Sequence, residues 1–133
     1  MSIKESAENY LETILILKNK TGNVRSVDIA NALSYTKPSV SVAMKKLREE
    51  NYITVDTTGN INLTKKGLDI ANKMYERHSI IAKALIAIGV DEESALLDSC
   101  KIEHVISEKS FNCIKNFLKN KSRHNAVSLF IFK

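Results

Sequence analysis

The segment SVDIANALSYTKPSVSVAMKKLREE, residues 26–50, is the most informative part of the chain about its fold. It predicts a short helix over residues 27–33 with Ser26 as its N-cap, followed by a tight turn. A second helix comes next, and Pro38 fits its first turn because the missing N–H needs no helical partner there. The small side chain of Ala30 allows the two helices to cross closely. Together these features predict a helix-turn-helix.

The next segment, YITVDTTGNINLT at residues 52–64, alternates apolar and polar side chains on both sides of a Thr58-Gly59-Asn60 turn. This pattern predicts two short strands, and a hairpin placed directly after the second helix is a wing. Apolar residues at helical spacing predict further helices over residues 4–20, 64–88, 92–106 and 107–120. The expected fold is therefore mainly α, with a winged helix-turn-helix at residues 1–66 and a helical domain at residues 67–133.

The composition is that of a soluble globular protein, with 44% hydrophobic and 26% charged residues in a chain of 133. We find neither an apolar signal core near the N-terminus nor a run of about 18 apolar residues. The two cysteines, Cys100 and Cys113, make no disulfide framework. We expect a cytoplasmic protein with reduced thiols and no membrane partner.

The charge is unevenly spread along the chain. Residues 13–66 carry nine basic and four acidic side chains, whereas residues 91–108 carry six acidic side chains and one lysine. A basic segment beside an acidic one suits phosphate contacts in the first and cation capture in the second, although both could equally be solvated faces.

The turn and the start of the second helix are the expected DNA-reading elements. The N-terminal end of such a helix enters the major groove, where its free N–H groups and small side chains face phosphates and base edges. Lysines further along the helix suit neutralisation of the DNA backbone. The expected DNA-binding residues are Ser26, Thr36, Lys37, Pro38, Ser39, Ser41, Val42, Lys45 and Lys46. The alternative is a winged helix that serves only in protein–protein contacts.

The segment Cys100-Lys-Ile-Glu-His104 places a thiol, a carboxylate and an imidazole at i, i+3 and i+4, on one face of a helix. These groups suit a divalent transition metal, but three ligands on one helix leave a site half open. Glu12, which shares a helical face with Asn9, and His78 are further candidates. Spacing alone leaves metal binding and ordinary surface roles both open. Cys113 lies near an apolar stripe and is expected to be packed, and His124 lies among basic residues, a poor environment for a cation.

Several stretches resemble the diphtheria toxin repressor family, specifically its short two-domain manganese-regulator type. They are AENYLETIL near the start, VDIANAL and KPSVSVAMKKL in the helix-turn-helix, LTKKG after the wing, and ERH, IGVDEE and CKIEHVIS in the C-terminal half. The resemblance implies a homodimeric, metal-activated repressor that binds a double-stranded DNA operator with inverted-repeat symmetry. It also implies that residues 67–133 form a metal-binding and dimerisation domain.

Carried over position by position, the family's metal ligands fall on Asn9, Glu12, His78, Cys100, Glu103 and His104. Asn9 departs from the family pattern, which has a carboxylate or a thioether there. Cys100 matches the iron-sensing type, whereas Glu12 resembles the manganese type. The mixed set leads us to expect Mn²⁺ or Fe²⁺ as cofactor, with Co²⁺ or Zn²⁺ able to substitute in vitro.

In the expected mechanism, metal joins the first helix to the two helices that carry the other ligands and so sets the spacing of the reading helices in the dimer. Regulation of metal uptake genes follows from the resemblance. One alternative is a winged-helix repressor controlled by a small organic ligand, which needs an apolar pocket and no metal. Another is a small metalloenzyme, which the sequence disfavours because it contains no HExxH-type motif.

Overall fold

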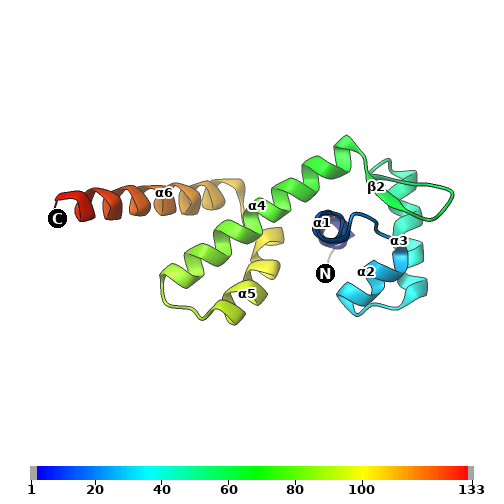
Figure 1. Cartoon of the computed structure of the whole chain (residues 1–133), viewed down its shortest axis with the longest axis horizontal. Coiled ribbons are helices and arrows are strands. Elements are labelled where there is room, and N and C mark those ends of the chain that lie inside the picture. Colours follow the sequence, from blue (N-terminus) through cyan, green and yellow to red (C-terminus); the bar gives the residue numbers. More distant parts are fainter. Residues whose placement is uncertain (1–2, 132–133) are drawn as a thin grey trace. The chain divides into compact units, whose positions relative to one another are not determined.

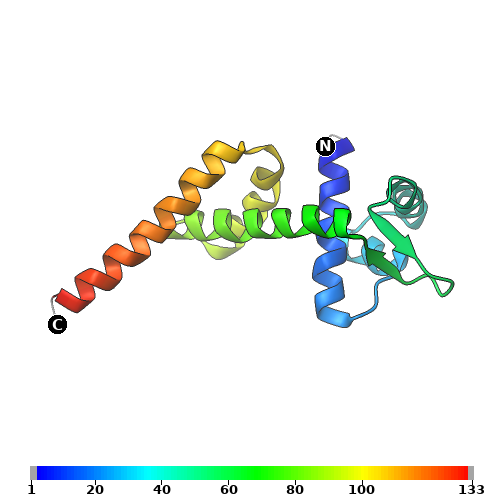
Figure 2. The ribbon, with the colours of Figure 1, turned by 90° about the horizontal axis from the view of Figure 1, so that it is seen from above.

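The computed structural model describes the backbone of residues 3–131, and the side chains of residues 4–121. It is mainly helical with one small antiparallel sheet, as the sequence predicts (Figures 1 and 2). The chain divides into two compact units, residues 1–75 and 76–133, which are described separately. The elements are α1 (Ile3–Thr21), α2 (Ser26–Leu33), α3 (Lys37–Glu49), β1 (Ile53–Val55), β2 (Ile61–Leu63), α4 (Lys65–Ala87), α5 (Glu92–Val105) and α6 (Glu108–Ile131).

The first unit is the winged helix-turn-helix. Its core is a set of apolar side chains from every element of the unit, most of them completely buried: Leu11, Ile14, Val24, Ile29, Val40, Met44, Leu47, Ile53, Ile61 and Ala71. In both views β1 and β2 lie close to α3 (Figures 1 and 2). Because α1 contributes Leu11 and Ile14 to the same core as α2 and α3, the first helix is an integral part of this winged helix-turn-helix.

Two N-caps define where α2 and α3 begin. The prediction that Ser26 caps α2 is wrong: Arg25 is the N-cap, and the Asp28 carboxylate accepts a hydrogen bond of 2.8 Å from the Arg25 N–H. A carboxylate three residues into a helix stabilises its start in this way, and so Ser26 becomes the first helical residue. For α3 the cap is Thr36, whose Oγ1 accepts a hydrogen bond from the Ser39 N–H. Pro38 lies in the first turn, as predicted.

The wing is a two-stranded hairpin in which Ile53 pairs with Leu63 and Val55 with Ile61. Its turn is organised by Asp56, whose Oδ1 accepts hydrogen bonds of 2.9 Å from the N–H groups of Thr58 and Asn60. The hydroxyl of Thr58 donates to the same oxygen, and these bonds hold the pKa of Asp56 below its ordinary value. The turn therefore depends on a carboxylate at its entrance as well as on the glycine within it.

The second unit contains the C-terminal part of α4, then α5 and α6. Figure 1 shows α5 running beside α4, and Gly89 in the connection between them has a φ of 105°. Asp91 caps α5 by accepting a hydrogen bond of 2.9 Å from the Ser94 N–H. Among the described side chains of this unit, few apolar ones are buried (Ile81, Ala82, Ala95 and Phe111), and the polar residues Arg77, Ser99 and Glu103 are buried with them. A small core that contains ionisable groups indicates that this unit is built around a polar site.

Two predictions about the C-terminal part are wrong. The last helix does not end at residue 120 but continues to Ile131, because no glycine or proline interrupts it. Cys113 is exposed and not packed, since it lies two residues, about 200° of helical rotation, from the buried Phe111. The side chain of His124 lies outside the described residues. None of the described helices combines the length and the apolar character that a membrane span requires.

Candidate metal centre

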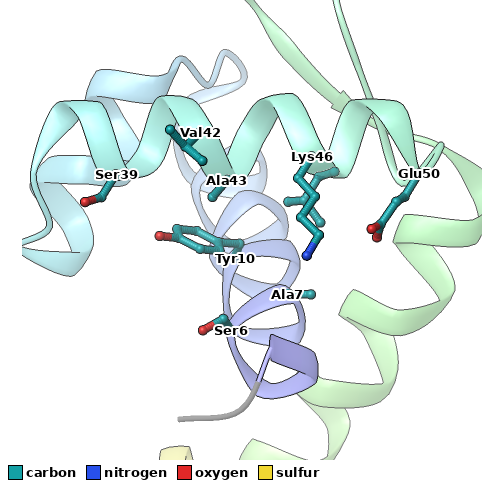
Figure 3. A pocket seen from close by; sticks show the side chains of 9 residues that line it. Ser6, Ala7, Tyr10, Ser39, Val42, Ala43, Lys46 and Glu50 are labelled. Carbon is teal, nitrogen blue, oxygen red and sulfur yellow. The ribbon is translucent and has the colours of Figure 1, made fainter.

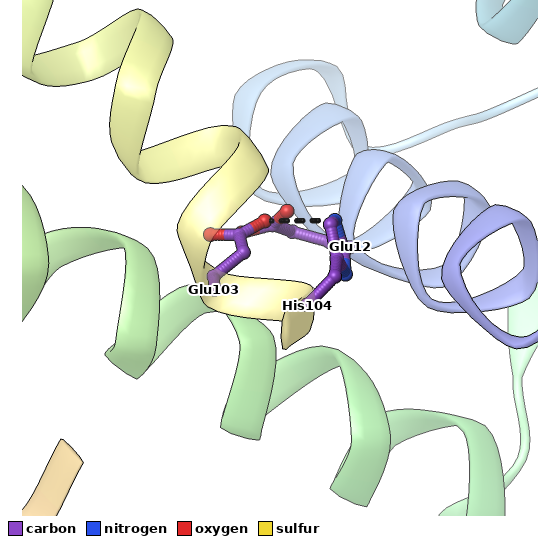
Figure 4. Close-up of side chains that lie close together, drawn as sticks. All are labelled: Glu12, Glu103 and His104. Carbon is purple, nitrogen blue, oxygen red and sulfur yellow. Dashed lines mark ion pairs between the residues drawn. The ribbon is translucent and has the colours of Figure 1, made fainter. Parts of the chain in front are cut away.

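The second unit brings together four of the six predicted metal ligands. His78 comes from α4, and Cys100, Glu103 and His104 come from one turn of α5. His78 Nδ1 lies 3.5 Å from the sulfur of Cys100 and 3.3 Å from Oε2 of Glu103. On the other side of the carboxylate, Oε1 of Glu103 lies 3.3 Å from Nε2 of His104, the ion pair that is dashed in Figure 4. Two imidazoles therefore flank a single carboxylate, and a thiol lies against one of these imidazoles.

Glu103 is the centre of this cluster and is completely buried. Within the described part of the chain, neither of its carboxylate oxygens has a hydrogen bond of good geometry, and the imidazoles of His78 and His104 each lie 3.3 Å from one of them. A buried carboxylate without such bonds is costly unless a cation compensates its charge. Together with a thiol and two imidazoles, this carboxylate fits the donor set that a divalent transition metal requires.

The electrostatics of the cluster act most strongly on His78. Interaction with the sulfur of Cys100, and then with the carboxylate of Glu103, raises the pKa of His78 to about 10, although burial opposes this shift. The metal-free site therefore holds a proton on the imidazole at neutral pH. A metal ion that uses the same nitrogen has to displace that proton.

Ser99 is a member of the cluster that sequence analysis missed. Its hydroxyl is completely buried, lies 3.0 Å from His78 Nδ1 and donates a hydrogen bond of 3.0 Å to the Leu96 carbonyl. Since a serine has one hydroxyl hydrogen, the bond to Leu96 leaves Ser99 as an acceptor toward His78. Ser99 is adjacent to Cys100 in sequence, but serines are common on helices and carry no comparable signal.

The other two predicted ligands, Asn9 and Glu12, belong to α1 in the first unit. Glu12 is buried, with a relative exposure of 5%, and Asn9 is half-buried. Figure 4 also draws Glu12. Buried glutamates are rare outside ion pairs and metal sites, so Glu12 is a notable residue within the winged helix.

The predicted DNA-binding residues form a largely exposed group on α2, α3 and the turn between them. Ser26 is half-buried, and the exposed members are Thr36, Lys37, Pro38, Ser39, Ser41, Val42, Lys45 and Lys46. Val42 is an apolar side chain with 71% of its surface exposed, which is unusual on a helix with a well-packed inner face. The Thr36 hydroxyl donates a hydrogen bond of 2.8 Å to the Ser39 hydroxyl, so both side chains are ordered at the start of α3.

A cavity of about 310 Å³ lies beside α3 in the first unit (Figure 3). It is lined by residues of α1 and α3, with the Tyr10 ring next to α3, and by the adjoining Glu50. Its lining includes Ser39, Val42 and Lys46 of the expected DNA-binding group. An apolar pocket is what the organic-ligand alternative requires, but this one shares its walls with the reading helix.

The comparisons with known proteins identify the class. The family model described as the iron dependent repressor N-terminal DNA binding domain matches residues 2–60. The model described as the iron dependent repressor metal binding and dimerisation domain matches residues 64–126. The chain is thus a DNA-binding transcriptional regulator, and it belongs to the iron-dependent repressor family, the family of the diphtheria toxin repressor. The resemblance is confirmed, and the family consists of regulators and not enzymes.

Individual relatives agree with this assignment. A helix-turn-helix transcriptional regulator of Methanocaldococcus jannaschii is 30% identical over 119 residues, which cover 88% of this chain and 95% of that protein. The transcriptional regulator MntR of Bacillus subtilis is 34% identical over 114 residues, covering 86% and 80%. The solved structure of the manganese regulator SloR matches with a TM-score of 0.76 and 27% identity over 90% of this chain. This chain spans 55% of SloR.

Proposed function

We propose that this protein is a metal-activated repressor whose ion is held by His78, Cys100, Glu103 and His104, together with Glu12 and Asn9 of the first helix. The observation that supports it most is the buried Glu103 carboxylate between two imidazoles, one of which also lies 3.5 Å from the sulfur of Cys100. When bound, the ion would supply positive charge beside this carboxylate in place of the proton on His78. In this proposal residues 1–66 bind DNA, and residues 67–133 bind metal and dimerise.

The donor set supports Mn²⁺ or Fe²⁺ as the physiological cofactor. Carboxylates favour Mn²⁺ and Fe²⁺, whereas the thiol of Cys100 favours Fe²⁺ and softer ions. The manganese regulator SloR, which is 27% identical to this chain, supports Mn²⁺. Asn9 offers a neutral amide oxygen, which is a weaker donor than a carboxylate. In vitro, Co²⁺ or Zn²⁺ can substitute, because sites of this kind generally bind both ions more tightly than Mn²⁺.

The coupling between metal and DNA runs through α1. Glu12 lies on the same helix as Leu11 and Ile14, which are part of the core that α2 and α3 share. Holding Glu12 at the metal therefore constrains the whole winged helix as one body. An ion that binds best to the DNA-competent arrangement raises DNA affinity, and DNA raises metal affinity by the same factor.

The DNA partner in this proposal is an inverted-repeat operator that a homodimer reads with two copies of α3. Two half-sites of this kind lie about one helical turn apart, roughly 34 Å, or a multiple of that distance. Ser39 and Ser41 near the start of α3 suit phosphates, and Thr36, Pro38 and the exposed Val42 suit base edges or thymine methyl groups. The protein acts in the cytoplasm and controls genes of metal uptake.

The dimer interface is proposed to include apolar side chains near the connection between α4 and α5. Ile88 is 74% exposed, Leu97 is 62% exposed, and Ile86 and Leu96 are each more than 40% exposed. Exposed apolar side chains that cluster in sequence around one connection are typical of a surface that a second chain covers. Burying them in a dimer would also place two metal sites and two reading helices in one assembly.

The test is fluorescence anisotropy of labelled DNA from upstream of this gene and of neighbouring transporter genes. Binding is measured with chelator and then with Mn²⁺, Fe²⁺ under anaerobic conditions, Co²⁺ and Zn²⁺. We expect tight binding only with metal, and its loss in Glu103→Ala and His104→Ala. The matched control is Asp98→Ala, which removes an exposed acid from the same helix. DNA binding that ignores both metal and chelator would refute the proposal and favour a repressor controlled by an organic ligand.

A further inference from the structure

Arg77 is a buried cation, with only 6% of its surface exposed. Its Nη1 donates hydrogen bonds to the carbonyls of Glu103, at 3.1 Å, and Ile106, at 3.0 Å. Its Nη2 donates to the carboxylate of Glu108 at 2.8 Å, and its guanidinium lies over the ring of Phe111. Within the described residues Nε has no hydrogen-bond partner. Burial of a guanidinium with one unsatisfied donor costs free energy, so a contribution to stability does not by itself explain why Arg77 is buried here.

The two backbone acceptors of Arg77 lie in the last turn of α5 and its C-cap. Carbonyls at the end of a helix have no partner within the helix, and a cation placed there also interacts favourably with the helix dipole. Arg77 thus replaces the missing partners of the turn that carries Glu103 and His104. Its third acceptor, Glu108, is the first residue of α6, so one side chain from the middle of α4 joins the end of α5 to the start of α6.

We propose that Arg77 is a positioning residue of the metal centre, which holds the last turn of α5 so that Glu103 and His104 face His78. The next residue of α4 is His78 itself, and consecutive helical residues point about 100° apart. Arg77 therefore contacts the backbone of Glu103 while His78 lies against its carboxylate. This inference rests on the proposed metal site.

The conservative variant Arg77→Lys keeps the charge but removes the planar group that reaches three acceptors. Co²⁺ is the probe, because its visible absorption reports both the coordination geometry and a thiolate ligand. Affinity is measured by competition with a chelator of known strength. Loss of a supporting contact around a metal ligand costs about 10- to 100-fold in metal affinity, and we expect a loss in this range together with altered cobalt absorption bands.

The matched control is Lys115→Gln. Lys115 forms an ion pair with Glu76, which also joins α6 to α4 but is partly exposed. This variant is expected to keep the cobalt affinity and spectrum of the unaltered protein. A second variant, Glu108→Gln, keeps an acceptor for Arg77 and changes a side chain that is 61% exposed, so it tests the network if Arg77→Lys does not fold. A several-fold loss of affinity is expected for it.

The outcomes separate the two proposals. If the unaltered protein binds Co²⁺ tightly but the Arg77→Lys and Glu108→Gln variants do so with the same affinity and spectrum, Arg77 is only structural and this inference is wrong. If Co²⁺ does not bind to the unaltered protein, the proposed metal site fails, and this inference fails with it. A variant that melts at a lower temperature yet keeps the cobalt spectrum also counts against positioning.

Discussion

Metal affinity is expected to fall steeply as the pH is lowered, because His78 has to lose a proton before it can bind a metal. The pKa of His78 is raised to about 10 by Cys100 and Glu103. Below that pH each unit reduces the fraction of deprotonated imidazole tenfold. Between about pH 8.5 and about pH 6.5 the affinity for Co²⁺ or Mn²⁺ should therefore fall about 100-fold, or about 2.7 kcal/mol, from this residue alone.

The assay is titration calorimetry at several pH values, repeated in buffers with different heats of ionisation so that released protons are counted. The protein is expected to release one proton from His78 near neutral pH, in addition to any released by the other ligands. In the His78→Gln variant the affinity should be lower and its pH dependence should be smaller by one proton. An affinity that is constant over this pH range, or a proton count that His78→Gln leaves unchanged, would refute the reasoning.

The same shift predicts how stability depends on pH in the metal-free protein. Because the pKa of His78 is raised above its unfolded value of 6.5, its contribution to stability is fully present below that value and is lost as the pH rises toward 10. With metal bound the trend reverses, since binding itself strengthens with pH. Thermal melting at a series of pH values, with and without Mn²⁺, is expected to give two curves that diverge at higher pH.

Three further predictions concern the fold, the dimer and DNA binding. Gly67→Ala should destabilise the first unit by about 1–3 kcal/mol, because the added Cβ would lie 2.1 Å from the Tyr52 carbonyl oxygen. Urea denaturation measures this change, and unchanged stability would show that the backbone relaxes to remove the contact. Leu97→Asp should convert the dimer to monomer in sedimentation experiments, since it places a charge on the proposed interface; a dimer of unchanged strength would exclude Leu97 from that interface. Lys45→Gln should lower the slope of log affinity against log salt by about one per subunit, whereas an unchanged slope would mean that Lys45 contacts no phosphate.

Much of the fold could be predicted because its elements have local signals. The helix-turn-helix, the hairpin and the helices α4 and α5 follow from apolar spacing, turn residues and Pro38, and the sequence places their ends within one or two residues. The errors arose where two local signals competed or where none was present. Asp28 competes with Ser26 for the start of α2, and polar residues after position 120 do not by themselves end a helix.

The candidate metal site could be predicted in part for the same reason. Cys100, Glu103 and His104 lie within one helical turn, so their spacing brings them together before any tertiary structure is known. His78 is 22 residues from Cys100, so no local spacing joins them; it was a candidate as one of three histidines in the chain, and the resemblance to the repressor family placed it in the ligand set. Arg77 and Ser99 gave no signal, because an arginine or a serine on a helix is ordinarily a surface residue.

The placement of Arg77 and His78 next to each other on α4 has a further consequence for how the site responds to change. Arg77 donates a hydrogen bond to the backbone carbonyl of Glu103, and His78 contacts the carboxylate of the same residue. Both contacts therefore depend on the rotation of α4 about its axis. A rotation that moves His78 away from Glu103 also removes the cap from the end of α5. Metal binding and the order of that turn are therefore coupled: a bound ion stabilises the ordered turn, and an ordered turn strengthens metal binding. This coupling gives a physical reason for a costly buried guanidinium beside a buried carboxylate.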